Sequence, residues 1–203
     1  DNLMDGQILA LAGGVGGSKL ALGLANIIDR DHLRIVVNTG DDDVFHGLHV
    51  SPDLDTVMYT LAGLSDVETG WGLANESFRT LDMLKRYESE TWFNLGDQDF
   101  ATHIRRTQLL NEGKSLSQVT IKLSRSLGVE HQIIPMSDEK ITTMLSTSTG
   151  NLRMQEYFVK HQCEPIVQNV EYVGGLEAKP TKGFDDALNT AAITILCPSN
   201  PFL

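Results

Sequence analysis

The sequence has 203 residues, 41% of them hydrophobic, and a formal net charge of −11 at pH 7. This size gives one sizeable core, and the negative charge argues against sequence-independent nucleic-acid binding, which depends on Lys and Arg contacts to phosphates. No apolar run approaches the roughly 20 residues that span a bilayer, and no basic-then-apolar leader with a cleavage site is visible. We therefore expect a cytoplasmic protein without a nucleic-acid or membrane partner.

The two cysteines, Cys163 and Cys197, belong to no CxxC or His/Cys cluster, so zinc and a disulfide framework are poor candidates. We expect both to be buried thiols in a reducing compartment. The chain ends on "CPSNPFL" directly after an apolar run, which leads us to expect further sequence beyond it.

Strands and helices alternate along the chain. Apolar and β-branched runs predict strands over residues 7–14, 33–40, 91–96, 131–138 and 191–196, the last followed by a loop. Helical spacing of apolar residues predicts helices over residues 18–28, 51–63, 99–110 and 115–128. Residues 141–159 read as a strand, a turn at 149–151, and then a strand or a helix. The order predicts one α/β domain over residues 1–203, with an open, mainly parallel Rossmann-like sheet and helices on both faces.

Ligands of such sheets bind beyond the carboxyl ends of the strands, and a glycine-rich loop follows the first strand. Its glycines are Gly13, Gly14, Gly16 and Gly17, with Lys19 beyond them. Glycines and a helix N-terminus suit phosphate, but the spacing fits neither a Walker A loop nor the dinucleotide fingerprint. Phosphate binding and a merely tight turn remain equal alternatives on this motif alone.

Acidic residues follow other predicted strands. Asp41, Asp42 and Asp43 end the second strand, where they form either a solvated turn or ligands for a hard cation such as Mg²⁺. Ser51 and Pro52 read as the start of the next helix, and capping explains one of the two acids that follow, Asp53 and Asp55. The second acid is free to hold or deprotonate a hydroxyl.

Three further strand ends carry polar residues. Asn94 and Asp97 begin the first of these segments, and for His103 on the helix behind it a partly exposed helical position is the favoured interpretation. The second segment runs over residues 135–138. The third holds Ser199 and Asn200 between two prolines, a rigid loop suited to reading a purine edge. Converging acids without excess Lys or His suit metal-assisted chemistry on a phosphate ester.

Seven motifs in order resemble one family: "GGVGGSK", "NTGDD", "HVSPDLDT", "LGDQDFATH", "PMSD", "QEYFV" and "PSNP". From Ile8 onward the chain is similar to the 2-phospho-L-lactate transferase (CofD-like) family of coenzyme F-420 biosynthesis. Family members continue past "PSNP", usually with an SI-x-PI stretch. The resemblance implies that a guanosine diphosphate-activated lactyl or enolpyruvyl acid is the donor and that the deazaflavin Fo (7,8-didemethyl-8-hydroxy-5-deazariboflavin) is the acceptor. Its ribityl hydroxyl attacks the phosphorus that bears the acid, GMP leaves, and Mg²⁺ is required.

With this resemblance, each group of candidate residues has an expected role. Asp55 and Asn94 stand where the family contacts Fo, although relatives often carry a basic residue in place of Asn94. Asp55 would orient or deprotonate the ribityl hydroxyl, and Asp42 is the second catalytic candidate. Asp42 and Asp53 would hold Mg²⁺, with Asp41 as the second choice.

The glycine loop and Lys19 would hold the donor diphosphate, and Ser199 and Asn200 would lie near the guanosine. The family is often dimeric, so a homodimer is an expectation. The nearest alternative is a UDP-sugar-binding regulator of the gluconeogenesis factor-like group, which is not an enzyme. An NAD(P)-dependent oxidoreductase is disfavoured by the broken fingerprint, and a catalytically inactive scaffold is a third alternative.

Overall fold

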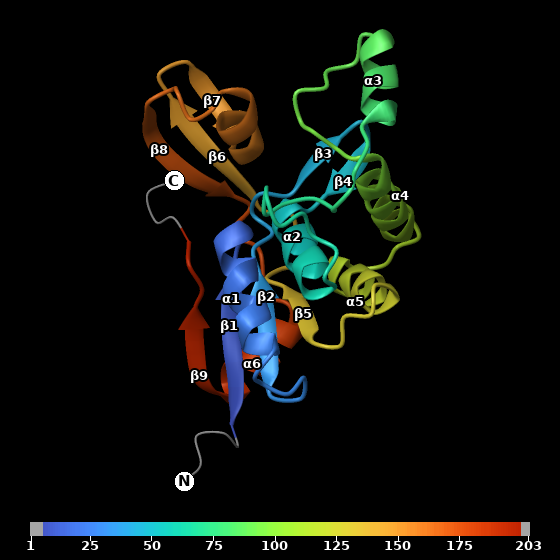
Figure 1. Ribbon diagram of the computed structural model, residues 1–203. Helices are drawn as coiled ribbons and strands as arrows, with labels where there is room; N and C mark the ends of the chain where they lie inside the picture. Colours follow the sequence, from blue (N-terminus) through green and yellow to red (C-terminus); the bar gives the residue numbers. More distant parts are fainter. Residues whose placement is uncertain (1–5, 200–203) are drawn as a thin grey trace.

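The computed structural model describes residues 6–199, and its centre is a parallel sheet with the strand order β5-β2-β1-β9 (Figure 1). Its strands are β1 (Gln7–Ala12), β2 (Leu33–Val37), β5 (Gln132–Pro135) and β9 (Ala191–Leu196). All three neighbouring pairs are parallel, as the apolar runs predict. The predicted fold class is confirmed for this sheet, whereas the two smaller sheets described below are antiparallel.

Helices cover both faces of the central sheet, as predicted. On one face Leu33, Ile35 and Val37 of β2 pack with apolar residues of three helices. These helices are α1 (Val15–Ala25), α2 (Pro52–Leu61) and α5 (Leu116–Ser126). On the other face Val36 and Ile134 pack against Ala187 of α6 (Lys182–Thr190). Alternating side chains of one strand therefore supply two separate cores.

The strand order places a topological switch point between β1 and β9. The chain moves outward from β1 to β2 and β5, and then returns through α6 to β9 on the opposite side of β1. Open α/β sheets bind ligands at such a point, beyond the carboxyl ends of the strands. The glycine-rich loop follows β1 and Pro198 follows β9, so both lie there.

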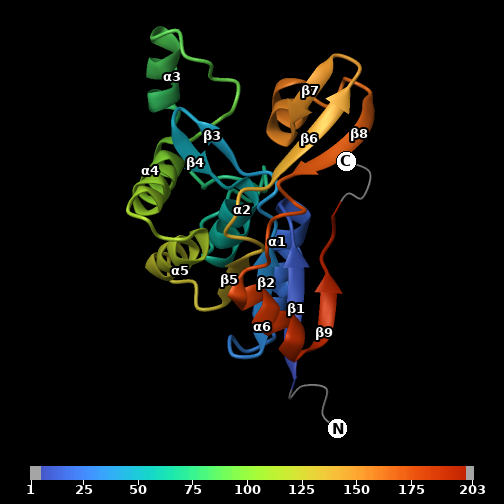
Figure 2. The ribbon, with the colours of Figure 1, turned by 180° about the vertical axis from the view of Figure 1, so that it is seen from behind.

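Two structures stand beyond the carboxyl ends of the parallel strands (Figures 1 and 2). One is an antiparallel sheet in the order β7-β6-β8, with a short π-helix, η1. Its elements are β6 (Thr142–Thr147), β7 (Gly150–Arg153), η1 (Glu156–Lys160) and β8 (Val167–Val173). The other joins a hairpin to two helices: β3 (Asp43–Phe45), β4 (Leu48–Val50), α3 (Arg79–Arg86) and α4 (Asp97–Asn111). Of these, the sequence patterns predict β6 and α4 and leave the segment of β7 and η1 open between a strand and a helix, but they predict neither the hairpin, nor α3, nor β8.

The strand predicted over residues 91–96 is wrong, because this segment has no ladder partner and leads directly into α4. Its apolar side chains pack instead with Phe45 of the hairpin. The Phe45 and Phe93 rings are stacked with centroids 4.1 Å apart, and Trp92 meets Phe45 edge-on at 5.3 Å. Leu95 is buried in the same cluster. The apolar pattern thus reports a small local core rather than a strand of the sheet.

The expectation of two buried thiols is half right: Cys197 is buried, but Cys163 is exposed, and both are free. Within residues 6–199, no helix combines the length and the apolar character that crossing a bilayer demands.

Candidate functional site

The glycine-rich loop lies close to Asp53 on one side and to Pro198 on the other. Gly14 is the N-cap of α1, so Gly16 and Gly17 lie inside the first turn of the helix rather than before it. A Cβ on Gly14 would stand 3.0 Å from Oδ1 of Asp53, and one on Gly16 would stand 3.1 Å from the carbonyl oxygen of Pro198. No described side chain caps this helix start, so its first N–H groups remain available to an anion.

Asn38, at the end of β2, joins two of the acids. Its Nδ2 donates to Oδ2 of Asp41 at 3.0 Å and to Oδ2 of Asp53 at 2.9 Å. Its Oδ1 accepts from the Gly40 N–H at 2.9 Å, which fixes the amide orientation. The structure therefore links Asp53 to Asp41, the second choice for a metal ligand, more directly than to Asp42.

Asp42 and Asp43 turn toward other partners. Ser51 Oγ donates to Oδ2 of Asp42 at 2.7 Å, and His49 Nε2 lies 3.0 Å from the same oxygen. Ser51 is the N-cap residue of α2 as predicted, but its hydroxyl serves Asp42 rather than the helix. Asp43 forms an ion pair with Arg153 of β7. Consecutive acids thus face different parts of the molecule.

Burial without a full set of partners raises the pKa of the carboxyl groups of Asp41, Asp42 and Asp53. For Asp53 the value reaches about 7, first through burial and then through the negative charge of Asp41. Oδ1 of Asp41 and Oδ1 of Asp42 are buried without a hydrogen-bond donor. Unsatisfied carboxylate oxygens in the turn that Asn38 links to Asp53 fit a hard cation such as Mg²⁺.

A second acidic group begins with Asp55, two residues after Asp53 on α2, and its carboxylates have cationic partners. Both carboxylate oxygens of Asp55 accept from Arg106 of α4, and each residue is at most 5% exposed. Nδ1 of His103 lies 3.2 Å from the Arg106 guanidinium, and Nε2 of His103 lies 3.2 Å from Asp99. The Tyr59 hydroxyl donates to Asp99 at 2.6 Å.

The partly exposed position that the sequence favours for His103 is wrong, because this side chain is 1% exposed. Burial alone would raise the pKa of Asp99, but His103 and the Tyr59 hydroxyl bring it below its ordinary value. Burial opposes the charge on Arg106, and Asp55 nevertheless raises the pKa of that guanidinium.

The three groups Asp55, Asp99 and His103 have ligand atoms within 4.8 Å of one another. Among the described residues, no such trio forms from Asp41, Asp42 and Asp53. The trio on α2 and α4 nevertheless fits a cation poorly, since the Arg106 guanidinium already supplies its positive charge. The acids around Asn38 are better suited, because their charges are uncompensated.

The sequence patterns miss Asn38 and Arg106, although a signal exists for the second. Asp99, His103 and Arg106 are spaced i, i+4 and i+7, which places them on one face of a helix. Asp97, also from this motif, has a structural role: it accepts from Ser77 Oγ and from the backbone at the start of α3.

Several predicted site residues contact neither acidic group. Lys19 and Asn94 are exposed, and neither has a side-chain hydrogen bond or ion pair within residues 6–199. Ser199 is exposed just beyond Pro198, which contacts the glycine loop, and Asn200 lies outside the described residues. Their expected roles remain predictions.

A cleft of about 380 Å³ opens beside the acidic turn. It lies between the hairpin, residues 89–93 and η1, and Asp43 forms part of its wall. Phe45, Trp92 and Phe93 supply aromatic surface, while Lys160 lies over the Trp92 ring at 5.5 Å. An aromatic wall bordered by ion-paired side chains suits a planar conjugated ring.

The fold and these positions define a Rossmann-like α/β protein with a glycine-rich helix start and buried acids at the switch point of its sheet. The family model for "2-phospho-L-lactate transferase CofD" matches residues 8–203. The chain therefore belongs to the CofD family, as its motifs indicate.

Curated relatives agree with this assignment. The 2-phospho-L-lactate transferase of Methanospirillum hungatei is 39% identical over 195 residues, which cover 96% of this chain and 66% of the relative. The phosphoenolpyruvate transferase of Streptomyces griseus is 40% identical over 200 residues, with 96% and 63% covered. This chain thus spans slightly less than two thirds of the length of these relatives.

A solved structure shares the fold. A UPF0052 family protein from Bacillus halodurans aligns with a TM-score of 0.61 at 16% identity and covers 95% of this chain and 58% of its own. At that identity the likeness concerns the fold alone.

Proposed function

We propose that the whole protein transfers a phospho-lactyl or phospho-enolpyruvyl group to the deazaflavin Fo and releases GMP, in coenzyme F-420 biosynthesis. The donor is lactyl- or enolpyruvyl-2-diphospho-5'-guanosine. The observation that carries this proposal is the position of the Asp53 carboxylate, whose Oδ1 lies within 3.0 Å of the Cβ position of Gly14. An uncompensated acid beside a phosphate-suited helix start suits a reaction that needs charge neutralisation and in-line positioning.

In this proposal, the N–H groups of the first turn of α1 hold the donor diphosphate. Asp53 and Asp41 would hold Mg²⁺, and Asp42, whose ligand atoms do not converge with theirs, would add negative charge nearby. The cation, when bound, neutralises charge on the phosphates and acts as a Lewis acid. Ser199 and Asn200 would lie near the guanosine, and Lys19 beside the diphosphate.

Of the two roles predicted for Asp55, its pairing favours orientation over proton removal. Both its oxygens accept from Arg106, so a proton transferred to Asp55 would have to compete with a buried guanidinium. We therefore assign Asp55 to holding the ribityl hydroxyl, or the end of α2 that faces it, in place.

The deazaflavin ring fits the aromatic cleft beside the acidic turn. Phe45 and Trp92 offer surface for the ring, and the ion-paired side chains of Lys160 and Arg153 offer N–H donors for its oxygen substituents. Asn94 follows Phe93 and would contact Fo without a charge.

The test is mass spectrometry of products from the full-length protein with Fo, Mg²⁺ and each candidate donor. We expect GMP and a phosphodiester of Fo, and Asp53→Asn should lower turnover by about a hundredfold or more. The matched control is Asp186→Asn, which removes an exposed acid of α6 and should leave turnover unchanged.

Absence of product with both donors, together with binding of UDP-N-acetylglucosamine, would contradict the proposal and favour the UDP-sugar-binding regulator instead. A cytoplasmic location and a homodimer remain predictions, to be checked by fractionation of cells and by light scattering.

A further inference from the structure

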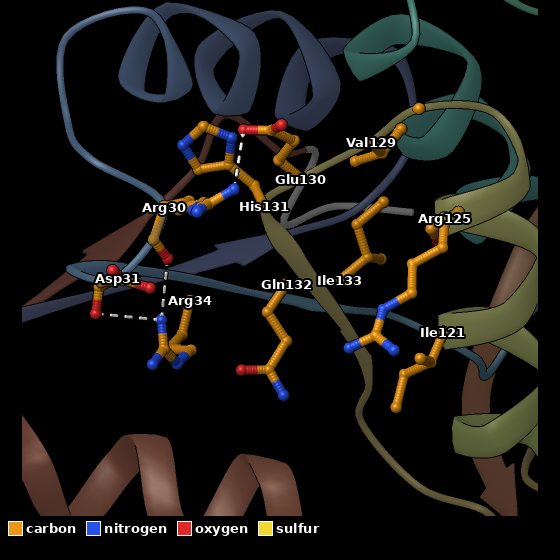
Figure 3. Close-up of a pocket in the computed structure, with 12 residues that line it drawn as sticks. Arg30, Asp31, Arg34, Ile121, Arg125, Val129, Glu130, His131, Gln132 and Ile133 are labelled. Carbon is orange, nitrogen blue, oxygen red and sulfur yellow. Dashed lines mark hydrogen bonds and ion pairs between the residues drawn. The ribbon is translucent and has the colours of Figure 1, made fainter.

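A cavity lies away from the acidic turn and the glycine loop. It has a volume of about 640 Å³ and opens where residues 30–34 meet residues 124–133 (Figure 3). Arg34 is the second residue of β2, and Gln132 is the first residue of β5. The cavity therefore lies at the amino-terminal ends of these two strands. The glycine loop follows the carboxyl end of β1 and is therefore at the opposite end of the sheet.

The path of α6 explains why this corner is open. The Thr181 N–H before α6 donates to Met136 just past β5, and Ala191 after it pairs with Gln7 at the start of β1. The helix therefore crosses the sheet diagonally and covers Ile134, but not the start of β5. Arg34 and Gln132 are register partners on neighbouring strands and share the face that α6 leaves uncovered there.

Two guanidinium groups of this cavity lack acidic partners. Nη1 of Arg34 donates to the main-chain carbonyls of Arg30, Asp31 and Leu33 at 3.0–3.2 Å, which holds the group in place without neutralising it. Within residues 6–199, the Arg125 side chain has neither a hydrogen bond nor an ion pair. By contrast, Arg30 on the rim is paired with Glu130 at 3.1 Å.

The arrangement suits an anion with several oxygens. Figure 3 shows the Gln132 side chain between those of Arg34 and Arg125, with Ile121 and Ile133 supplying apolar wall. Guanidinium forks bind phosphate through paired hydrogen bonds, and an amide between them adds a further donor. Attraction of Arg125 to the carboxyl end of α5 would explain that residue alone, but not the fixed and unneutralised Arg34.

We propose that this cavity binds a small phosphate-bearing anion through Arg34 and Arg125. The site is separate from the proposed transferase site and does not depend on the proposed function. Its volume falls within the range of small-molecule sites, so the ligand can carry an organic group against the isoleucines.

The test is calorimetric titration of the protein with inorganic pyrophosphate at low and moderate salt. The Arg125→Gln variant should weaken binding at this site by about tenfold, the effect of losing one charge-assisted contact. Arg34→Lys keeps the charge but loses the fork, and should weaken binding in the same direction. The matched control is Lys122→Gln, which removes an exposed cation from the same helix outside the cavity and should change affinity by less than about twofold.

The Gly16→Val variant distinguishes pyrophosphate bound at the glycine loop from pyrophosphate bound in this cavity, because its side chain would meet Pro198. We expect Gly16→Val to leave the Arg125-dependent binding intact. Binding that is unchanged by Arg125→Gln and Arg34→Lys, or lost equally in Lys122→Gln, would overturn the proposal. Circular dichroism of each variant verifies that it folds.

Discussion

Two groups of buried acids differ in whether a cationic side chain neutralises them. Asp41 and Asp53 form the first group, and Asp55 of α2 and Asp99 of α4 form the second. Asp53 shares the Asn38 amide with Asp41 and faces the glycine loop, and within residues 6–199 it has no cationic partner. Asp55 is bound through both oxygens to the buried Arg106. The first group has raised carboxyl pKa values, while in the second the pKa of Asp99 is lowered.

The difference separates a candidate ligand site from a structural network. A buried carboxylate that keeps its partners locks neighbouring helices together, here α2 and α4. A buried carboxylate that lacks them costs stability, and such strain is found where a ligand or cation supplies the missing partner. Neither the residue type nor its place in the first helical turn distinguishes Asp53 from Asp55.

The largest expected change in stability follows from removing Arg106, the cation of the paired group. Arg106→Leu leaves the buried Asp55 with only the longer contact to His103, whose Nδ1 lies 3.7 Å from Oδ2, and should lower the free energy of unfolding by about 3–5 kcal/mol. Urea unfolding followed by circular dichroism measures it. Arg105→Gln removes the neighbouring cation, whose side chain is 40% exposed, and should change stability by less than about 0.5 kcal/mol. Equal effects of both substitutions would show that the buried pair has no special role.

A smaller loss of stability is expected from removing the Tyr59 hydroxyl, which belongs to the same network. Tyr59→Phe removes the hydroxyl that donates to Asp99 at 2.6 Å and should cost about 2 kcal/mol, as is typical of hydrogen bonds to charged groups. Thermal unfolding at pH 7 measures this loss. In the Arg106→Leu background the loss should shrink if the network acts as a unit, and strict additivity would contradict such coupling.

The smallest expected change in stability is a gain, from neutralising Asp53. Asp53→Asn should stabilise the protein by about 1–2 kcal/mol at pH 8, because it removes the cost of the buried carboxylate, while burial of the new amide N–H groups offsets part of that gain. The pKa of Asp53 is raised from 3.8 to about 7, so this cost is absent below about pH 4 and complete above about pH 7. Unfolding curves of both proteins should therefore converge as the pH falls from 8 to 4.

The control for this prediction is Asp55→Asn at pH 8, which should destabilise because Arg106 loses its carboxylate. Stabilisation by both substitutions would mean that the two acids do not differ in the way described.

Periodicity predicts the central sheet and α1, α2 and α5, whose apolar faces meet one common core, and also α4, whose Phe100 packs in the smaller core around Leu95. It misses the hairpin, whose turn uses His46 and Gly47 at positive φ rather than the usual Asn-Gly pair. It also turns the aromatic run around Trp92 into a strand, since burial against a hairpin and burial in a sheet give the same local pattern.

The candidate site is predicted as a set of residues but not as a geometry. The motifs identify Asp41, Asp42, Asp53 and Asp55 as candidates. Which of them is neutralised depends on the contact between Arg106 and Asp55. These residues are 51 positions apart, so no local pattern contains this contact. The same holds for Asn38, whose amide selects Asp41 rather than Asp42 as the partner of Asp53.

The most direct measurement is an NMR titration of the Asp side-chain carboxyl carbons, with Asp53→Asn used for assignment. The unneutralised cluster predicts an apparent midpoint for Asp53 of about 7, which Mg²⁺ should lower because the cation favours the carboxylate. A midpoint near 3.8, unchanged by Mg²⁺, would show that Asp53 is an ordinary carboxylate and would contradict the assignment of a cation site beside the glycine loop.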